Sequence, residues 1–424
     1  MFSLLYMVIG AIALIIGGVV CLNVESLFGA TMSAEELSRA STILAIMTIN
    51  LALSFPMGIY GFIITAYEDF VFQKALNIIR ILLNTAVMIC LLHFGYKAVA
   101  MVVVQAVFNL LTFIANWLYC RRKIRVRFSF RGFRWDFMRE VAIYSFWIFL
   151  NAIMDRIYWS TGQFVLGVFS GTAMVAVFAV AIQLQSIYIS FSTAVTGVFL
   201  PKVSAMVASQ ASEAEVSDLF VRVGRVQYAV MAFILSGFIV FGQPFIRVWA
   251  GEAYSQAYVI TLLFFVGLLI PLIQNMGITI LQARNQMRFR SLLYIVIAIF
   301  SLGGQILLAK SYGAIGCAVS IVAALIIGQG VIMNIYYHRK QHINIPLFWR
   351  EIGKMSVVPA IMVCVGLWFT SRYDVSDIGN LFVGISLFSL MYLPLFWRFS
   401  LSAEERDMIK SPLFRVLKHR VITR

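Results

Sequence analysis

The sequence predicts an all-α integral membrane protein with about twelve transmembrane helices. Of its 424 residues, 62% are hydrophobic and only 12% are charged, and the mean hydropathy is +0.92. A soluble domain carries about 25% charged residues. The apolar runs are continuous over about 20 residues, the length that a helix needs to cross a bilayer, whereas strands of a membrane barrel would alternate over about ten.

Twelve apolar runs are long enough to be transmembrane helices. They lie at 2–22, 41–66, 76–96, 98–120, 141–168, 172–200, 224–248, 256–282, 290–309, 312–337, 356–372 and 378–397. Lys and Arg concentrate in every second loop, above all in 121–139 and 398–424. Because basic loops stay on the cytoplasmic side, both termini are predicted to be cytoplasmic.

Short sequence matches recur at one offset and predict two pseudo-symmetric lobes. YCRRK at 119–123 resembles YHRKQ at 337–341, 218 residues later, and Pro56 and Pro271 interrupt two spans at nearly that offset. The spans at 141–168 and 172–200 have no counterpart earlier in the chain. We therefore expect an N-terminal lobe that lacks its first two helices. The alternative is a twelve-span protein with unequal halves.

The predicted organisation has four parts. They are an N-terminal lobe at 1–120, a basic cytoplasmic connector at 121–140, a six-helix lobe at 141–340, and two extra helices with a basic tail at 341–424. In the connector, basic residues alternate with apolar ones, which is typical of a segment that lies on an anionic leaflet.

The segment NAIMDRIYWSTGQ, residues 151–163, places an aspartate and an arginine near the middle of an apolar span. Such a charge costs about 2.5–3.5 kcal/mol on insertion scales and normally faces the bundle interior or water. The candidate substrate-binding residues are Asn151, Asp155, Arg156, Gln163, Gln183 and Gln185. Asp155 is also the candidate coupling group. The alternative is that the two charges pair with other helices and lock the bundle.

The next span carries two polar stripes at helical spacing, and we expect both to face an interior cavity. One contains Gln183, Ser186, Ser190 and Thr193; the other contains Gln185, Tyr188, Ser192 and Thr196. Other mid-span amides, such as Asn84 and Asn109, are more often interhelical glue than ligands. Arg80 lies one turn into its predicted span, so we expect it to extend to the cytoplasmic surface.

Several function classes find no support in the sequence. It contains no GxSxG, HExxH or P-loop motif, and its five cysteines and four histidines are dispersed. The net charge of +15 comes from loops between spans, which disfavours nucleic acid as a partner. Transport without a cofactor is predicted, driven by an unidentified ion gradient or running downhill.

Two segments resemble a known family. QFVLGVFSGTAMVAVFAVAIQL at 163–184 and FLPKVSAM at 199–206 are similar to helices of polysaccharide flippases, through Leu166-Gly167, Ser170-Gly171 and Pro201-Lys202. Their superfamily also holds multidrug antiporters and the lipid II flippase. The resemblance implies two six-helix lobes around a central cavity, in some members with two extra helices, and alternating access. Gln163 stands where members often carry an acid, and here the acid is Asp155.

The sequence therefore predicts a flippase, not an enzyme, for an undecaprenyl pyrophosphate-linked oligosaccharide in surface polysaccharide assembly, such as that of O-antigen. The predicted location is the bacterial inner membrane. Membrane lipids and a polysaccharide polymerase complex are the further predicted partners. One alternative is a drug or cation antiporter of the same fold. The other is a membrane enzyme or scaffold in polysaccharide assembly.

Overall fold

The computed structural model describes residues 2–28, 32–67, 69–124, 154, 158–209, 212–284, 286–373, 375, 377–402 and 406, and their regular structure is all helical. Within this part, nine helical segments are long and apolar enough to cross a membrane. Large apolar side chains point outward, with exposed fractions of 87% at Leu22, 81% at Val71 and 75% at Phe300. Contact of such an apolar surface with lipid has no energetic cost, whereas its contact with water is unfavourable. The predicted all-α membrane fold is confirmed.

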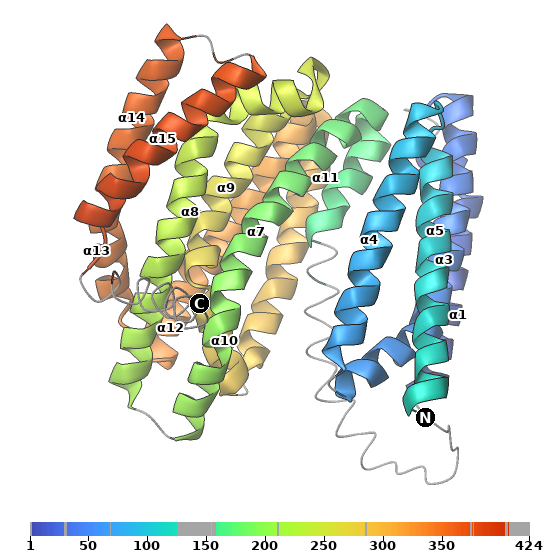
Figure 1. Cartoon of the computed structure of the whole chain (residues 1–424), viewed down its shortest axis with the longest axis horizontal. Coiled ribbons are helices and arrows are strands. Elements are labelled where there is room, and N and C mark those ends of the chain that lie inside the picture. Colours follow the sequence, from blue (N-terminus) through green and yellow to red (C-terminus); the bar gives the residue numbers. More distant parts are fainter. Residues whose placement is uncertain are drawn as a thin grey trace, which may run out of the picture. The chain divides into compact units, whose positions relative to one another are not determined.

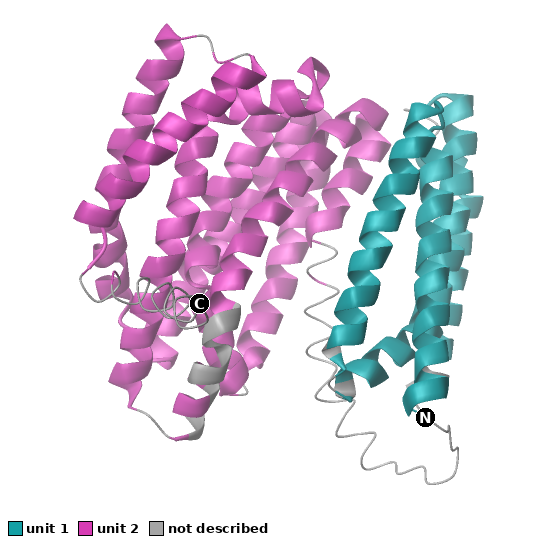
Figure 2. Cartoon of the chain, in the orientation of Figure 1, with its two compact units in different colours: residues 1–142 teal, residues 143–424 magenta. Residues whose placement is uncertain are grey.

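The chain forms two compact units, Met1–Ala142 and Ile143–Arg424 (Figure 2). Unit 1 contains α1 (Phe2–Leu22), α2 (Val24–Phe28), α3 (Ala34–Ala66), α4 (Phe70–His93), α5 (Ala98–Tyr119) and the π-helical turn η1 (Cys120–Ile124) (Figure 1). Helix α1 packs on α3 through glycine, since a Cβ at Gly10 would lie 2.6 Å from the carbonyl oxygen of Ala52. Small residues let helices approach closely in lipid.

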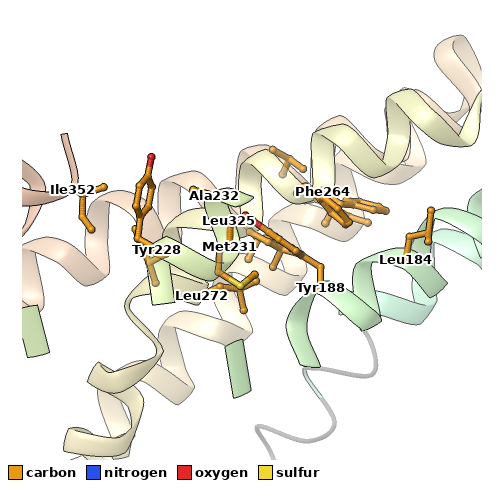
Figure 3. Packing of buried hydrophobic residues seen from close by; sticks show 14 of the residues in the cluster. Leu184, Tyr188, Tyr228, Met231, Ala232, Phe264, Leu272, Leu325 and Ile352 are labelled. Atoms are coloured by element: carbon orange, nitrogen blue, oxygen red, sulfur yellow. Dashed lines mark hydrogen bonds between the residues drawn. The ribbon is translucent and has the colours of Figure 1, made fainter. Parts of the chain in front are cut away.

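In the described part of unit 2, the first helical segment is 158–169, after a helical residue at 154. The unit continues with α7 (Gly171–Ala208), α8 (Glu213–Ala250), η2 (Glu252–Tyr254), α9 (Ala257–Ile273), α10 (Asn275–Ala283), α11 (Met287–Leu325), η3 (Ile326–Ile332), α12 (Met333–Lys340), α13 (Ile345–Met355), α14 (Val357–Arg372) and α15 (Ile378–Phe399). Its core contains Tyr188 of α7, Met231 of α8 and Leu272 of α9, all buried (Figure 3). These three helices therefore form the centre of the unit.

The helices coincide with the predicted spans. The span 141–168 is described only at 154 and at 158–169, which are helical, and every other predicted span contains a described helix. Helix α4 begins at Phe70, earlier than the predicted start at 76. Beyond Ile124 the predicted connector lies outside the described residues. The division into lobes at 1–120 and 141–340 stays a prediction.

A sharp turn at Gly313 divides α11 into two spans. A straight helix of its 39 residues would measure about 58 Å, roughly twice the hydrocarbon thickness of a bilayer. Gly313 has φ 55° and ψ −134°, a conformation that residues with a Cβ rarely adopt. The two arms run antiparallel, because Ser320 Oγ donates to Ser301 O at 2.9 Å and Cys317 Sγ lies 4.0 Å from Gln305 O. The separate spans predicted at 290–309 and 312–337 are confirmed.

Helix α13 is one element that the sequence analysis did not predict. Ile345, Phe348, Ile352 and Met355 are buried on one face, while Lys354 on the other face is exposed. The spacing i, i+3, i+7 and i+10 is that of an amphipathic helix. At 11 residues it is too short for a span, which is why a search for long apolar runs does not find it.

Ion pairs join segments that the charge pattern assigns to the cytoplasmic side. In unit 1, Lys123 Nζ lies 2.8 Å from Asp69 Oδ2, and in unit 2, Arg225 lies 2.6 Å from Glu351. Hydrogen bonds from Lys123 and then Tyr119 hold the pKa of the Asp69 carboxyl below its usual value. The contribution of Asp69 to stability is therefore present at neutral pH and is lost as the pH falls through that lowered pKa.

In each unit a pair of neighbouring helical segments packs antiparallel, and the two registers agree to within about one turn. In unit 1, Asn84 Nδ2 donates to Gln105 Oε1 at 3.4 Å, so α4 and α5 run antiparallel with these two residues level. The positions 218 residues later are 302 and 323, within about one turn of the contact between Ser301 and Ser320 in α11. The offset found in the sequence therefore has a counterpart in how α4 and α5, and the two arms of α11, pack.

The α11 turn generates a stability prediction. A Cβ at Gly316 would lie 2.8 Å from the carbonyl carbon of Leu308, whereas one at Gly303 meets nothing within 4 Å. We expect Gly316→Ala to destabilise the protein by about 1–3 kcal/mol because backbone atoms of the other arm must move. The matched variant Gly303→Ala should be neutral or slightly stabilising. Thermal unfolding of the detergent-solubilised protein measures both, and equal melting temperatures would contradict the prediction.

Candidate functional site within the membrane-spanning helices

The two charges that the sequence singles out are not placed by the structure. Asn151, Asp155 and Arg156 lie outside the described residues. Their proximity to one another and to a cavity therefore stays a prediction. The described residues also contain no group of three or more His, Cys, Asp or Glu side chains that could hold a metal ion.

The polar stripes of α7 differ in burial. Gln183 is exposed, and so are the other members of its stripe, Ser186, Ser190 and Thr193. Gln185 is only 2% exposed, and its whole stripe is buried. Gln163, in the helical segment at 158–169, is half-buried. Within unit 2 the stripes therefore do not form one accessible polar face, because only the Gln183 stripe is open.

The buried stripe connects α7 to two other helices. Tyr188 Oη donates to Met231 O of α8 at 3.2 Å, and Ser192 Oγ donates to Leu272 O of α9 at 2.8 Å. Gln227 Nε2 of α8 donates to Ser192 Oγ at 2.9 Å. Hydrogen bonds of this kind, to helix backbones and between side chains, are the pattern of interhelical contacts. Gln227 Oε1 is buried without a partner among the described residues. A role of Gln185 in substrate binding stays a prediction.

A second set of amides sits at the break between α9 and α10. Pro271 lies two residues before the end of α9, and Gln274 separates the two helices. Gln274 Nε2 donates to Asn334 Oδ1 at 2.8 Å, and Asn334 Nδ2 donates back at 3.2 Å. Trp349 Nε1 donates to the same Asn334 oxygen at 3.0 Å. These contacts hold the broken helix against α12 and α13, so they too are structural.

Unit 1 contains a different arrangement, centred on Arg80 of α4. Arg80 is the eleventh of the 24 residues of α4, about 15 Å along its axis. Its guanidinium donates to Asn109 Oδ1 of α5 and to Asn77 Oδ1, each at 3.0 Å. Arg80 and Asn109 lie in the same antiparallel register as Asn84 and Gln105. The expectation that Arg80 extends to the cytoplasmic surface stays a prediction, because one of its partners, Asn77, lies about one turn nearer the start of α4.

The hydrogen bonds continue from Arg80 to a third helix. Asn109 Nδ2 donates to Asn50 Oδ1 of α3 at 3.2 Å, and Asn50 Nδ2 donates to Ala106 O at 3.2 Å. All the side chains in this chain of contacts except Arg80 are neutral. No ion pair among the described residues includes Arg80. The guanidinium charge is therefore oriented but not neutralised by these partners.

A small polar cavity adjoins this arginine. Its volume is about 140 Å³, and it is lined by Arg80, Ile81, Asn84, Thr85, Gln105, Phe108 and Asn109. Asn84 Oδ1 is buried and has no hydrogen-bond partner among the described residues. The sequence contains a pattern that indicates this site. Asn77, Arg80 and Asn84 have the spacing i, i+3 and i+7, which puts them on one helix face.

Comparison with known proteins identifies the family. A family model described as polysaccharide biosynthesis protein matches residues 2–259. The chain belongs to this family. Among solved structures, the lipid II flippase MurJ in its inward closed conformation is similar, with a TM-score of 0.73 over 94% of this chain and 83% of that chain, at 17% identity. No curated protein sequence matches the chain.

The family and the structural likeness answer different questions. At 17% identity the likeness to MurJ shows the fold, which is that of a multi-pass membrane protein. The family match assigns the chain to polysaccharide biosynthesis. Together they confirm the membership that the segments at 163–184 and 199–206 predict. Neither comparison assigns a function to individual residues of this chain.

A double variant tests the structural role of the buried α7 stripe. Ser192→Ala should destabilise the protein by about 1–3 kcal/mol, because Leu272 O and Gln227 each lose a partner in a buried position. Combining Ser192→Ala with Gln227→Leu should cost less than the sum of the two single changes, since both polar partners are then removed. Thermal unfolding measures the coupling. If the double variant is stable but loses export, the stripe has a functional role instead.

Proposed function

We propose that this protein is a secondary transporter that flips an undecaprenyl pyrophosphate-linked oligosaccharide across the bacterial inner membrane. The observation that carries the proposal is the family match over residues 2–259 in a chain with a flippase-like fold. Alternating access would move the glycan to the outer leaflet, with both termini of the chain in the cytoplasm. There the glycan would be available to a polysaccharide polymerase, which we propose as the partner that extends it.

The chemistry of this substrate sets three requirements. Its pyrophosphate is anionic and cannot cross hydrocarbon unaided, so the pathway needs a cation. Its sugar hydroxyls need hydrogen-bonding side chains, and its prenyl chain needs an apolar surface. We propose Arg156 as the cation and Asp155 as a titrating, coupling group. Asn151, Gln163 and the open stripe that contains Gln183 would bind the sugars.

Unit 2 offers an apolar groove for the third requirement. A cavity of about 250 Å³ lies between α7, α8 and α15, and nearly all of its lining is apolar. Phe191 comes from α7, Phe233 and Phe241 from α8, and Phe388 from α15. Gly237 also lines the groove, and no atom lies within 4 Å of the place where its Cβ would be. A flexible prenyl chain fits such a surface without any polar contact.

Substitution of the central charges tests the proposed transport. Arg156→Ala should reduce glycan export to background because the pyrophosphate loses its counter-charge. Arg156→Lys should keep part of the activity if only the charge is needed, and little if bidentate phosphate contact matters. Asp155→Asn should impair turnover more than binding if this group couples transport to protons. The measurement is complementation of an exporter-deficient strain, with membrane levels checked by immunoblot.

Arg39→Ala is the matched control for these charge substitutions. Arg39 pairs with Glu35 on an exposed helix surface, so its removal should leave export unchanged. Normal export by both Arg156→Ala and Asp155→Asn at normal expression would show that these charges only lock the bundle. Absence of export by the unsubstituted chain in the matched genetic background would contradict the proposed function itself.

Filling the apolar groove tests its use by the prenyl chain. Gly237→Phe places a ring in open space, so the protein should fold normally while the groove narrows. Packing the prenyl chain around the added ring should cost about 1–3 kcal/mol. This cost would lower export by about 5- to 150-fold. Gly303→Phe is the matched control, because Gly303 is exposed and equally open but lies outside the groove. Equal export by the two variants would exclude the groove from the pathway.

A further inference from the structure

Arg80 is an intramembrane cation whose described partners do not cancel its charge. It lies about 15 Å into a helix that crosses a hydrocarbon layer of about 30 Å. Two of its five N–H groups donate to the amide oxygens of Asn109 and Asn77. These amides fix the plane of the guanidinium and leave its positive charge in place. An ionisable side chain within a membrane-spanning helix marks a functional site by default.

The alternative is that this network only holds helices together. The internal repeat of the chain provides a comparison that tests this alternative. Adding the repeat offset of 218 to Arg80 and Asn109 gives Ala298 in the first arm of α11 and Ile327 in η3, which continues the second arm. Adding it to Asn84 gives Leu302. These arms pack in nearly the same register as α4 and α5. The same helix pairing is therefore built in unit 2 with apolar residues at these places, and packing alone does not require the polar set.

The adjoining cavity has room and the chemistry for a ligand. Its volume of about 140 Å³ is roughly ten times the space that one water needs by the same kind of measure. One wall presents guanidinium N–H donors of Arg80. Asn84 and Gln105 contribute amide side chains to the same lining. A ligand that suits this lining carries an anionic oxygen next to a hydroxyl or another hydrogen-bonding group.

We propose that the Arg80 cavity binds an oxyanion of the translocated glycolipid, with neighbouring hydroxyls bonding to the amide side chains of Asn84 and Gln105 in its lining. This inference rests on the proposed function and adds a binding site in unit 1. The shared chemistry is a phosphate or a carboxylate, and it has two sources: the carrier pyrophosphate or an acidic sugar. Arg80 and Asn109 are the binding and positioning pair, and Asn50 orients Asn109 in turn.

Binding measurements on the full-length protein in lipid nanodiscs test this site. The probes are undecaprenyl pyrophosphate with undecaprenol as its uncharged match, and dodecyl glucuronide with dodecyl glucoside as its match. Arg80→Gln should weaken binding of an anionic probe by about 10- to 100-fold, the loss expected for a charge-assisted contact. The uncharged probes should be unaffected. Arg80→Lys should retain part of the affinity, and Arg39→Gln, the matched surface variant, should retain all of it.

The two anionic probes distinguish the sources. Loss confined to undecaprenyl pyrophosphate assigns the cavity to the carrier phosphate, and loss confined to the glucuronide assigns it to an acidic sugar. Equal affinities of the unsubstituted chain and Arg80→Gln for both anionic probes would overturn the proposal. So would an Arg80→Gln variant whose only defect is a lower melting temperature, because that is the result for a purely structural role.

A second variant replaces the polar set by its counterpart in unit 2. Arg80→Ala, Asn84→Leu and Asn109→Ile together should leave the protein folded, with a melting temperature close to that of the unsubstituted chain, and should abolish binding of the anionic probe. If this triple variant is unstable, Arg80→Gln alone decides the question. Export by the unsubstituted chain together with unchanged Arg80→Gln affinity would count against the cavity only, and the proposed function would stand.

Discussion

A polar group inside hydrocarbon must find its partner within the protein, and this constraint governs the whole structure. Water is absent, so backbone groups are satisfied inside helices, and any break in a helix must be repaired by side chains. The break between α9 and α10 shows the repair: Leu272 O accepts from Ser192, while Gln274 exchanges two hydrogen bonds with Asn334. The buried residues Ser192, Gln274 and Asn334 are therefore explained by the broken helix that they support.

The same constraint makes the polar set of unit 1 harder to explain by structure alone. Helix α3 contains Pro56, but the helix continues through this residue, from Ala34 to Ala66. The amides there bond to one another and to Arg80 rather than to a broken backbone, apart from the contact of Asn50 with Ala106 O. At the α9–α10 break of unit 2 the polar side chains support a broken helix. In unit 1 they surround the charged guanidinium of Arg80.

The spans could be predicted because a bilayer imposes length and composition on each helix separately. Even the turn at Gly313, inside a continuous run of helical residues, follows from the limit on span length. The side chains around each helix were harder to predict. Periodicity groups Gln185 with Ser192 but does not say which neighbour covers them, and the structure shows α8 and α9 in contact with this stripe. The burial of a side chain depends on which helices pack around it, and the sequence of one helix does not specify these neighbours.

Arg80 shows how a small error in a helix boundary changes a functional interpretation. A span that starts at 76 places this residue in the first turn, where a long side chain reaches the surface. The helix starts at Phe70, which places Arg80 about three turns from the first residue of the helix instead of about one. Depth is thus the decisive quantity for an intramembrane charge, and it depends on where the helix begins.

The choice of amides as partners for Arg80 has a consequence for ligand binding. A carboxylate in place of Asn109 would neutralise the guanidinium and compete with any anion that approached it. Each amide oxygen here accepts one hydrogen bond from the guanidinium, orients this planar group and leaves its charge uncancelled. An amide oxygen also binds the guanidinium less strongly than a carboxylate would. An approaching anion therefore replaces this contact at a small cost. A transporter must release its substrate as well as hold it, and a cation oriented by neutral groups meets both needs.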